Sequence, residues 1–167
     1  TIPLPYFEDS TAWFLAIRHL PYSAWLDSGR PQNELGRYDI LVADPVLTLT
    51  TEGTQTQIQT KTSAEISTED PFVLLSQQMK IDSSLKSDWP FVGGALGYWA
   101  YDLAWRLKKL PRKNHQDIEL PEMQLGIYCW AIIQDHQEKT CVLMMNQAID
   151  PAYNFSVIQQ LCRQTPM

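Results

Sequence analysis

The sequence predicts an α+β domain in which antiparallel sheets are flanked by helices, and three observations lead to this class. Helical segments are separated by groups of strands, without the regular strand–helix alternation of parallel sheets. Two pairs of strand-like segments flank polar turns at 52–53 and 135–140, as β-hairpins do. Hydrophobic residues make up 44% of the 167 residues and charged residues 19%, which is enough apolar material for a core.

The first elements are expected to be a helix and two strands. A helix over residues 10–20 is predicted because a Ser-Thr capping pair opens it and a proline follows it. Residues 24–26 are expected to form a short buried strand, and residues 38–43 a longer one that ends at an Asp-Pro pair. The Gly- and Pro-containing segment 27–36 between them is expected to be a loop.

A hairpin and a second helix follow. Residues 46–50 and 54–62 flank the Glu52-Gly53 turn, and their Thr- and Gln-rich composition indicates a solvated face. Asp70-Pro71 predicts a helix start, since Asp can cap the first turn and Pro lacks an N–H that would have no partner there. This helix is expected to extend to about Met79.

The third part of the chain contains a glycine cluster at 93–97, followed by a predicted helix over 101–110. The spacing of the glycines matches neither a dinucleotide fingerprint nor a Walker loop, so a close backbone approach inside a sheet is favoured over a phosphate loop. Residues 125–134 and 141–145 are expected to form a second hairpin. Asp150-Pro151 is expected to open a last helix with one apolar side.

Charge and cysteine usage exclude several classes of protein. The net charge is −6 and basic residues gather only at 106–113, so a nucleic-acid-binding surface is excluded. Polar residues interrupt every apolar run, so no membrane span is expected. Cys129, Cys141 and Cys162 have no metal-site spacing and are interpreted as buried thiols in a reducing, cytoplasmic compartment.

Residue types alone indicate no catalytic or metal-binding set. The three histidines are far apart, and surface or capping roles are expected for each. Asp135-His136 resembles half of a catalytic dyad but falls in a predicted hairpin turn. Three other aspartates stand at the ends of predicted elements, where structural hydrogen bonds are expected: Asp39, Asp44 and Asp102.

Three longer segments carry a family resemblance. They are residues 25–29 with 36–45 (GRYDILVADP), residues 90–103 (PFVGGALGYWAYDL) and residues 120–136. In content and order they resemble the N-terminal domain of component I of the para-aminobenzoate (aminodeoxychorismate) synthases, within the anthranilate synthase component I family of chorismate-using enzymes. The resemblance covers nearly the whole chain, so residues 1–167 are expected to form one such N-terminal domain.

The resemblance implies that catalysis takes place elsewhere. In the family, chorismate and magnesium bind a C-terminal domain that would follow Met167, so no catalytic residue, metal ligand or cofactor is expected here, and the fragment alone should be inactive. The intact enzyme would take ammonia from a glutamine amidotransferase subunit, component II. It would convert chorismate to 4-amino-4-deoxychorismate for para-aminobenzoate and folate synthesis.

Other interpretations stay open. One is the N-terminal domain of an anthranilate synthase component I, which serves tryptophan synthesis, although the sequence motif RYDILVADP favours the para-aminobenzoate enzymes. Another is a stand-alone amino-acid-binding module. A third is a structural subunit that supports a partner and needs neither ligand nor catalytic domain.

The resemblance also implies a tryptophan-type ligand pocket. A serine hydroxyl and loop backbone groups would meet the charged ends of the amino acid, and apolar side chains would enclose its ring. Relatives often carry an aromatic residue and Ser where this chain has Leu35 and Gly36, so fewer polar contacts are expected. The matching positions are Leu26, Ser28, Leu35, Gly36, Arg37 and Tyr38.

A last expectation concerns association. The apolar segments 98–105 and 127–133 alternate too little to leave one polar sheet face. In the family they would be covered by the C-terminal domain. Without that cover the chain is expected to self-associate.

Overall fold

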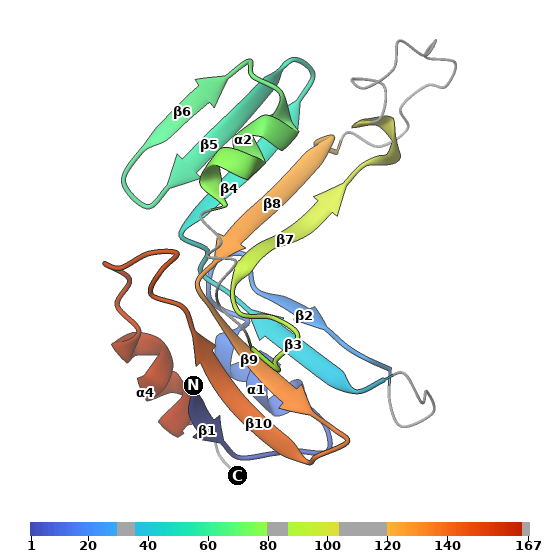
Figure 1. Ribbon diagram of the computed structural model, residues 1–167, viewed down its shortest axis with the longest axis vertical. Coiled ribbons are helices and arrows are strands. Elements are labelled where there is room, and N and C mark those ends of the chain that lie inside the picture. Colours follow the sequence, from blue (N-terminus) through green and yellow to red (C-terminus); the bar gives the residue numbers. More distant parts are fainter. Residues whose placement is uncertain (30–35, 80–86, 104–119, 165–167) are drawn as a thin grey trace. The chain divides into compact units, whose positions relative to one another are not determined.

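The computed structural model describes residues 1–29, 36–79, 87–103 and 120–164 (Figure 1). The chain divides into two compact units, each of which contains one five-stranded sheet. The chain passes from one unit to the other more than once. The first unit comprises Thr1–Val46, Lys80–Gly94 and Tyr128–Met167, and the second comprises Leu47–Met79 and Ala95–Ile127.

Sheet A, in the first unit, has the strand order β1-β10-β9-β3-β2 and is antiparallel throughout. Its central rows are apolar, since Leu143 lies opposite Ile132 and Ile132 lies opposite Leu41. The strands are β1 (Ile2–Leu4), β2 (Ala24–Leu26), β3 (Tyr38–Val42), β9 (Trp130–Asp135) and β10 (Thr140–Met145).

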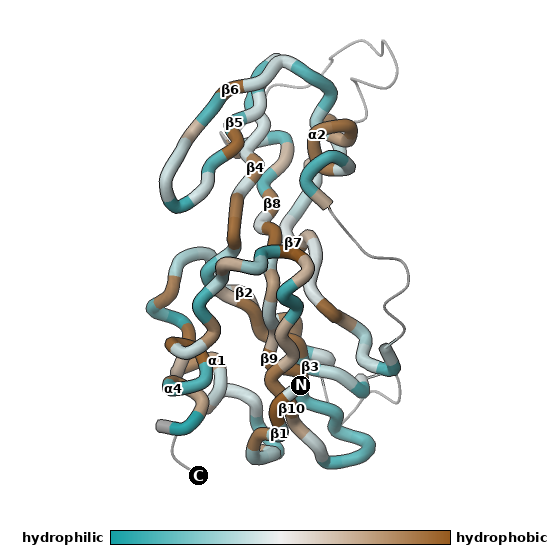
Figure 2. Tube along the Cα trace, turned by 60° about the vertical axis from the view of Figure 1, so that its left-hand side comes forward, coloured by the Kyte–Doolittle hydropathy of each residue, from teal (hydrophilic) through white to brown (hydrophobic). Residues whose placement is uncertain are grey.

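Two helices, α1 (Thr11–Ile17) and α4 (Ser156–Gln164), pack with sheet A around one core. Alternate residues of the central strands enter this core, as a pleated sheet requires. Figure 2 shows the hydrophobic colour concentrated along β9 and β10. The largest fully buried side chains of the core are Trp13, Ile17, Leu41, Trp130, Ile132 and Leu143.

Sheet B, in the second unit, has the order β6-β5-β4-β8-β7. Helix α2 (Pro71–Gln78) and a short 3-10 helix, η1 (Tyr101–Leu103), contribute Leu74 and Leu103 to its core, beside Leu49, Met123 and Leu125. The strands are β4 (Leu47–Glu52), β5 (Gln55–Thr60), β6 (Ala64–Ser67), β7 (Gly94–Trp99) and β8 (Met123–Tyr128). Two antiparallel sheets with three α-helices in the described part confirm the α+β class.

Three predictions that rest on short sequence signals are confirmed: a helix cap, a hairpin and a close backbone approach. The Asp70 carboxylate accepts hydrogen bonds from the N–H groups of Phe72 (2.9 Å) and Val73 (3.2 Å), so it caps α2. The predicted hairpin is present, with its turn one residue later than expected: Glu52 ends β4 and pairs with Gln55, and Gly53 and Thr54 form the turn. The glycine cluster does serve close backbone approach: a Cβ on Gly97 would collide with the carbonyl oxygen of Gln124 in β8.

Ser10 corrects a detail of the first helix. It stands at the N-cap of α1, but its side chain makes no capping hydrogen bond. Its hydroxyl donates to Asp39 instead, and Asp9 Oδ1 accepts from the Thr11 N–H at 2.8 Å. Hydrogen bonds to an ionised carboxylate are stronger than those between neutral groups, so the Ser10 hydroxyl is directed at Asp39 and not at the N–H groups of the first helical turn.

The segment 125–134 is not one strand. Residues up to Ile127 pair with β4 in sheet B, whereas residues from Trp130 pair with β10 and β3 in sheet A. Cys129 lies between them, and its carbonyl accepts from the Asn146 N–H at 2.7 Å. The apolar run has no Gly-Pro punctuation at this point, so the sequence pattern cannot mark the division.

Two other element predictions need correction, and two strands were missed. The last helix begins at Ser156, because Asp150 caps only a turn, through the Ala152 N–H, and Asn154 accepts from the Ser156 N–H. The strand at 24–26 is an edge strand whose Leu26 is half exposed. The strands β1 and β6 were not predicted, because each has only three or four residues.

The predicted helix over 101–110 begins with η1, and its remainder lies outside the described residues. The segment 127–133, expected to be an apolar surface, is fully buried instead. No helix among the described residues is long and apolar enough to cross a membrane.

All three cysteines are free and buried, as predicted. Burial raises the pKa of the Cys141 thiol to about 12, with a contribution from Cys162, and it raises the pKa of the Cys162 thiol to about 12.

Candidate functional site

A buried polar cluster in the first unit is centred on Asp39 of β3. Asp39 is 3% exposed, although it belongs to a strand of otherwise apolar residues. Its Oδ1 accepts the backbone N–H of Ser28 at 2.9 Å, and its Oδ2 accepts the hydroxyl of Ser10. His136 Nε2 lies 2.9 Å from the same Oδ2. Asp39 therefore connects the start of α1, the loop after β2 and the end of β9.

The other ring nitrogen of His136 also has a partner. Nδ1 lies 3.1 Å from the hydroxyl oxygen of Tyr6, and the two rings meet edge to face at 5.7 Å. The backbone N–H of His136 donates to the carbonyl of Arg37 at 2.9 Å. With both ring nitrogens directed at protein groups, His136 is placed to position the loop and not to act on a substrate.

The electrostatics of Asp39 follow from its partners. Burial raises the pKa of this carboxyl, but hydrogen bonds from Ser10, the Ser28 backbone and His136 outweigh burial, so the pKa of Asp39 is lowered. The Ser28 hydroxyl is buried and makes no hydrogen bond of normal geometry, yet it lies close enough to Asp39 to help lower this pKa. Asp39 is therefore held as a carboxylate.

An ion pair lies beside this cluster. The Arg37 Nη2 and Nε donate to Asp135 at 2.8 Å and 3.0 Å, in a two-pronged contact. The Asp135 side chain is 4% exposed and that of Arg37 is 40% exposed. Asp135 also accepts from the N–H groups of Gln137 (3.0 Å) and Glu138 (3.2 Å) in the β9–β10 turn. Burial raises the pKa of Asp135, but these hydrogen bonds and Arg37 outweigh it and lower the pKa.

The six predicted ligand positions divide as follows. Leu26 ends β2 with half of its surface exposed, and Tyr38 begins β3 with the Arg37 guanidinium 4.8 Å above its ring. The antiparallel pairing of β2 with β3 brings Ser28 to this end, next to Asp39. Gly36 is half-buried just before β3. Leu35 lies outside the described residues.

The structural hydrogen bonds expected for Asp39 are present, whereas the expectation for His136 was wrong. A surface or capping role was expected for His136, but the residue is 8% exposed and its ring is paired. A signal for Asp39 was present, since a carboxylate inside an apolar strand must find donors. Its partners could not be read from the sequence, because they come from three distant segments.

The remaining expected positions are structural or undescribed. The Tyr153 hydroxyl donates to Asp44 Oδ2 at 2.7 Å and accepts from Trp130 Nε1 at 3.0 Å, which accounts for Asp44. The Asp102 side chain is outside the described part of the structure. Among the described side chains, no three His, Cys, Asp or Glu residues cluster closely enough to hold a metal ion.

The amino-acid sequence of this chain is similar to those of several known proteins. No family model matches the chain. It is 37% identical over 169 residues to aminodeoxychorismate synthase component 1 of Salmonella typhimurium, a match that covers 99% of this chain and 37% of that relative. The chain is homologous to the N-terminal part of aminodeoxychorismate synthase component 1. The component 1 of Escherichia coli strain K12 is 38% identical over 155 residues, which are 91% of this chain and 34% of the relative.

This homologue of component 1 spans about a third of the length of the curated relatives it matches. Its fold is similar to that of anthranilate synthase component I from Streptococcus pneumoniae TIGR4. The TM-score is 0.65 at 19% sequence identity, over 80% of this chain and 30% of that chain. This likeness confirms the fold expected from the resemblance.

Proposed function

We propose that this chain is the N-terminal regulatory and structural domain of an aminodeoxychorismate synthase component I. The single observation that carries the proposal is the 37% identity to component 1 of Salmonella typhimurium over 99% of the chain. The intact enzyme would transfer ammonia to chorismate and form 4-amino-4-deoxychorismate for para-aminobenzoate and folate synthesis. In this chain, the packed polar clusters around Asp39 and Asp135 are suited to hold a loop in place and offer no free acid or base.

The partners follow from the same proposal. A C-terminal domain of the same polypeptide would bind chorismate and magnesium, and component II would supply ammonia from glutamine. The described residues contain no cluster that fits magnesium, so no catalytic step is assigned to them. Three free, buried cysteines support a cytoplasmic location.

We further propose that the loop between β2 and β3 forms a tryptophan-type pocket at Leu26, Ser28, Leu35, Gly36, Arg37 and Tyr38. The buried Ser28 hydroxyl, which lacks a hydrogen bond of normal geometry, supports a ligand contact there. The Arg37 guanidinium is already paired with Asp135. The proposal therefore relies on the Ser28 hydroxyl and not on the charge of Arg37.

Activity of the complete natural reading frame tests the proposal. The protein is expressed together with a glutamine amidotransferase subunit and assayed with chorismate, glutamine and magnesium, and products are separated by chromatography with mass detection. We expect 4-amino-4-deoxychorismate, and no turnover by residues 1–167 alone, because catalysis needs positioned acid/base groups and metal ligands together. Anthranilate as the product would replace the proposal with an anthranilate synthase. A reading frame that ends at Met167 would leave the stand-alone amino-acid-binding module.

A further inference from the structure

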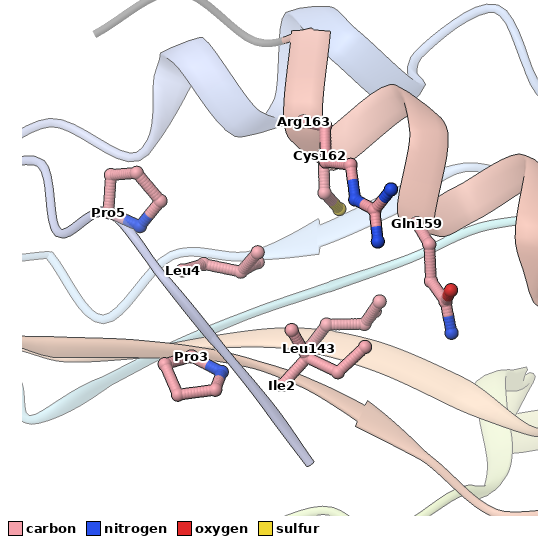
Figure 3. A pocket seen from close by; sticks show the side chains of 8 residues that line it. All are labelled: Ile2, Pro3, Leu4, Pro5, Leu143, Gln159, Cys162 and Arg163. Atoms are coloured by element: carbon pink, nitrogen blue, oxygen red, sulfur yellow. The ribbon is translucent and has the colours of Figure 1, made fainter.

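A second pocket of the first unit lies away from the Ser28 loop. It is formed by β1, β10 and α4, has a volume of about 400 Å³, and is shown in Figure 3. Ile2 and Leu4 of β1 and Leu143 of β10 form an apolar floor. Volumes of roughly 300–1,000 Å³ are typical of sites for small molecules, so this one suits a compact ligand.

Two polar side chains of α4 reach this pocket. Gln159 and Arg163 are four residues apart, one helical turn, and therefore share a side of the helix. Figure 3 shows the guanidinium and the amide projecting from α4 toward the strands that carry Ile2 and Leu143. The apolar floor and the two donors thus face the same space.

Both donors retain capacity for a ligand. Arg163 is exposed and forms no ion pair with any other residue that the structure describes. The Gln159 amide N–H donates only weakly, to the Met145 sulfur at 3.5 Å. No acidic side chain lines the pocket, and Arg163 is its one charged residue among those described. In a chain with a net charge of −6, this is a local site for an anion.

The helix end offers a simpler account of Arg163. A cation in the last turn interacts favourably with the partial negative charge of the helix C-terminus. That interaction does not require an apolar floor opposite the guanidinium or a second donor one turn earlier. A guanidinium beside an apolar cavity is instead the arrangement that binds a carboxylate attached to an apolar body.

We propose that this pocket binds a small amphipathic monocarboxylate. The apolar body of the ligand packs on Ile2, Leu4 and Leu143. Its carboxylate pairs with the Arg163 guanidinium and accepts a hydrogen bond from the Gln159 amide. The ligand is a small molecule and not a peptide, because the volume of about 400 Å³ accommodates a single ring or a short alkyl chain with its acid group.

The proposal is tested by titrating the 167-residue chain with 4-phenylbutanoate and recording amide NMR spectra. A parallel titration uses 4-phenyl-1-butanol, which has the same apolar body but no charge. We expect saturable shifts at residues 2–5, 143 and 159–163, and binding of the alcohol about tenfold weaker or more. Arg163→Gln is expected to weaken binding of the acid about tenfold and to leave the alcohol unchanged. The matched control is Arg18→Gln, because Arg18 is an exposed arginine of the same unit outside the pocket.

Four results would overturn the proposal. They are no saturation by the acid, equal affinity for acid and alcohol, unchanged affinity of Arg163→Gln, and shifts confined to the Ser28–Tyr38 region. If Arg163→Gln does not fold, the comparison of acid with alcohol on the unaltered chain decides alone. Retention of binding by Arg18→Gln together with its loss in Arg163→Gln supports the site.

Discussion

His136 and Asp39 lie side by side in the first unit, with Nε2 of the imidazole 2.9 Å from Oδ2 of the carboxylate. Both residues are almost fully buried. Removing the carboxylate would leave the buried donors around it without an acceptor. Asp39 also holds Ser28 and Ser10, so this contact connects the proposed ligand loop to the core.

Asp39→Asn is expected to lower the free energy of unfolding by about 3 kcal/mol, because an uncharged amide accepts weaker hydrogen bonds from its buried partners than a carboxylate does. Urea unfolding followed by circular dichroism measures the change. Asp27→Asn is the control: Asp27 is exposed and, among the described residues, accepts only the Gly29 N–H, so its effect should stay within about 0.5 kcal/mol. Equal effects of the two substitutions would contradict the assigned role.

Acid should destabilise the first unit by protonating the carboxylates of Asp39 and Asp135. The pKa values of Asp39 and Asp135 are lowered in the folded chain, so folding favours the ionised forms. Their stabilisation is fully present above the unfolded pKa, about 3.9, and is lost as the pH falls through the lower folded values. Unfolding free energies between pH 7 and pH 2 should show this loss, and the loss should be smaller in Arg37→Gln. An unchanged acid dependence of that variant would argue against the ion pair.

Gly97→Ala should disrupt the pairing of β7 with β8, because the added methyl group would collide with the Gln124 carbonyl. Since the neighbour is backbone, we expect a loss of about 3 kcal/mol or more in unfolding free energy. Gly53→Ala serves as the control, as its Cβ meets nothing within 4 Å. That substitution should lose only about 1 kcal/mol, from its left-handed conformation. Similar losses for both would show that β7 can shift.

Tryptophan should raise the melting temperature if the proposed loop site exists. A ligand that binds only the folded state stabilises it by about 2.7 kcal/mol at a hundredfold excess over Kd. Ser28→Ala should reduce the shift by removing a hydrogen bond to a charged group, worth about 1.5–3 kcal/mol. Ser23→Ala, which removes only an exposed hydrogen bond to the Arg18 carbonyl, should not. A melting curve that millimolar tryptophan leaves unchanged would mean that Leu35 and Gly36 have abolished the site.

Self-association should depend on the aromatic residues near the end of β7. Tyr98, Trp99 and Tyr101 are 37%, 44% and 91% exposed. Exposed apolar groups of this kind favour association, so light scattering on dilute protein should show more than a monomer. The double substitution of Trp99 and Tyr101 to Ser should lower the average molar mass measured by light scattering, whereas Leu15→Ser on α1 should leave it unchanged. A monomeric unaltered chain would refute the expectation.

The sequence by itself determined the elements whose causes lie within a few residues. Asp70-Pro71 starts α2 because the cap and the absent N–H act inside one turn. The β4–β5 hairpin forms next to the predicted Glu52-Gly53 signal, with Gly53 and Thr54 in the turn, because turn conformation is local. Antiparallel sheets followed from these hairpins. The ligand positions Leu26, Ser28, Arg37 and Tyr38 came from resemblance, since no local pattern marks them.

Only the tertiary structure decided where the strands divide and what the polar residues do. The apolar run around Cys129 has no turn signal, and it splits because its two halves pair with different sheets. The structural role of Asp39 depends on its contacts with Ser10, Ser28 and His136, which are distant in sequence. A buried carboxylate must find donors, but which ones it finds depends on strand register and helix placement, and these are fixed when the core packs.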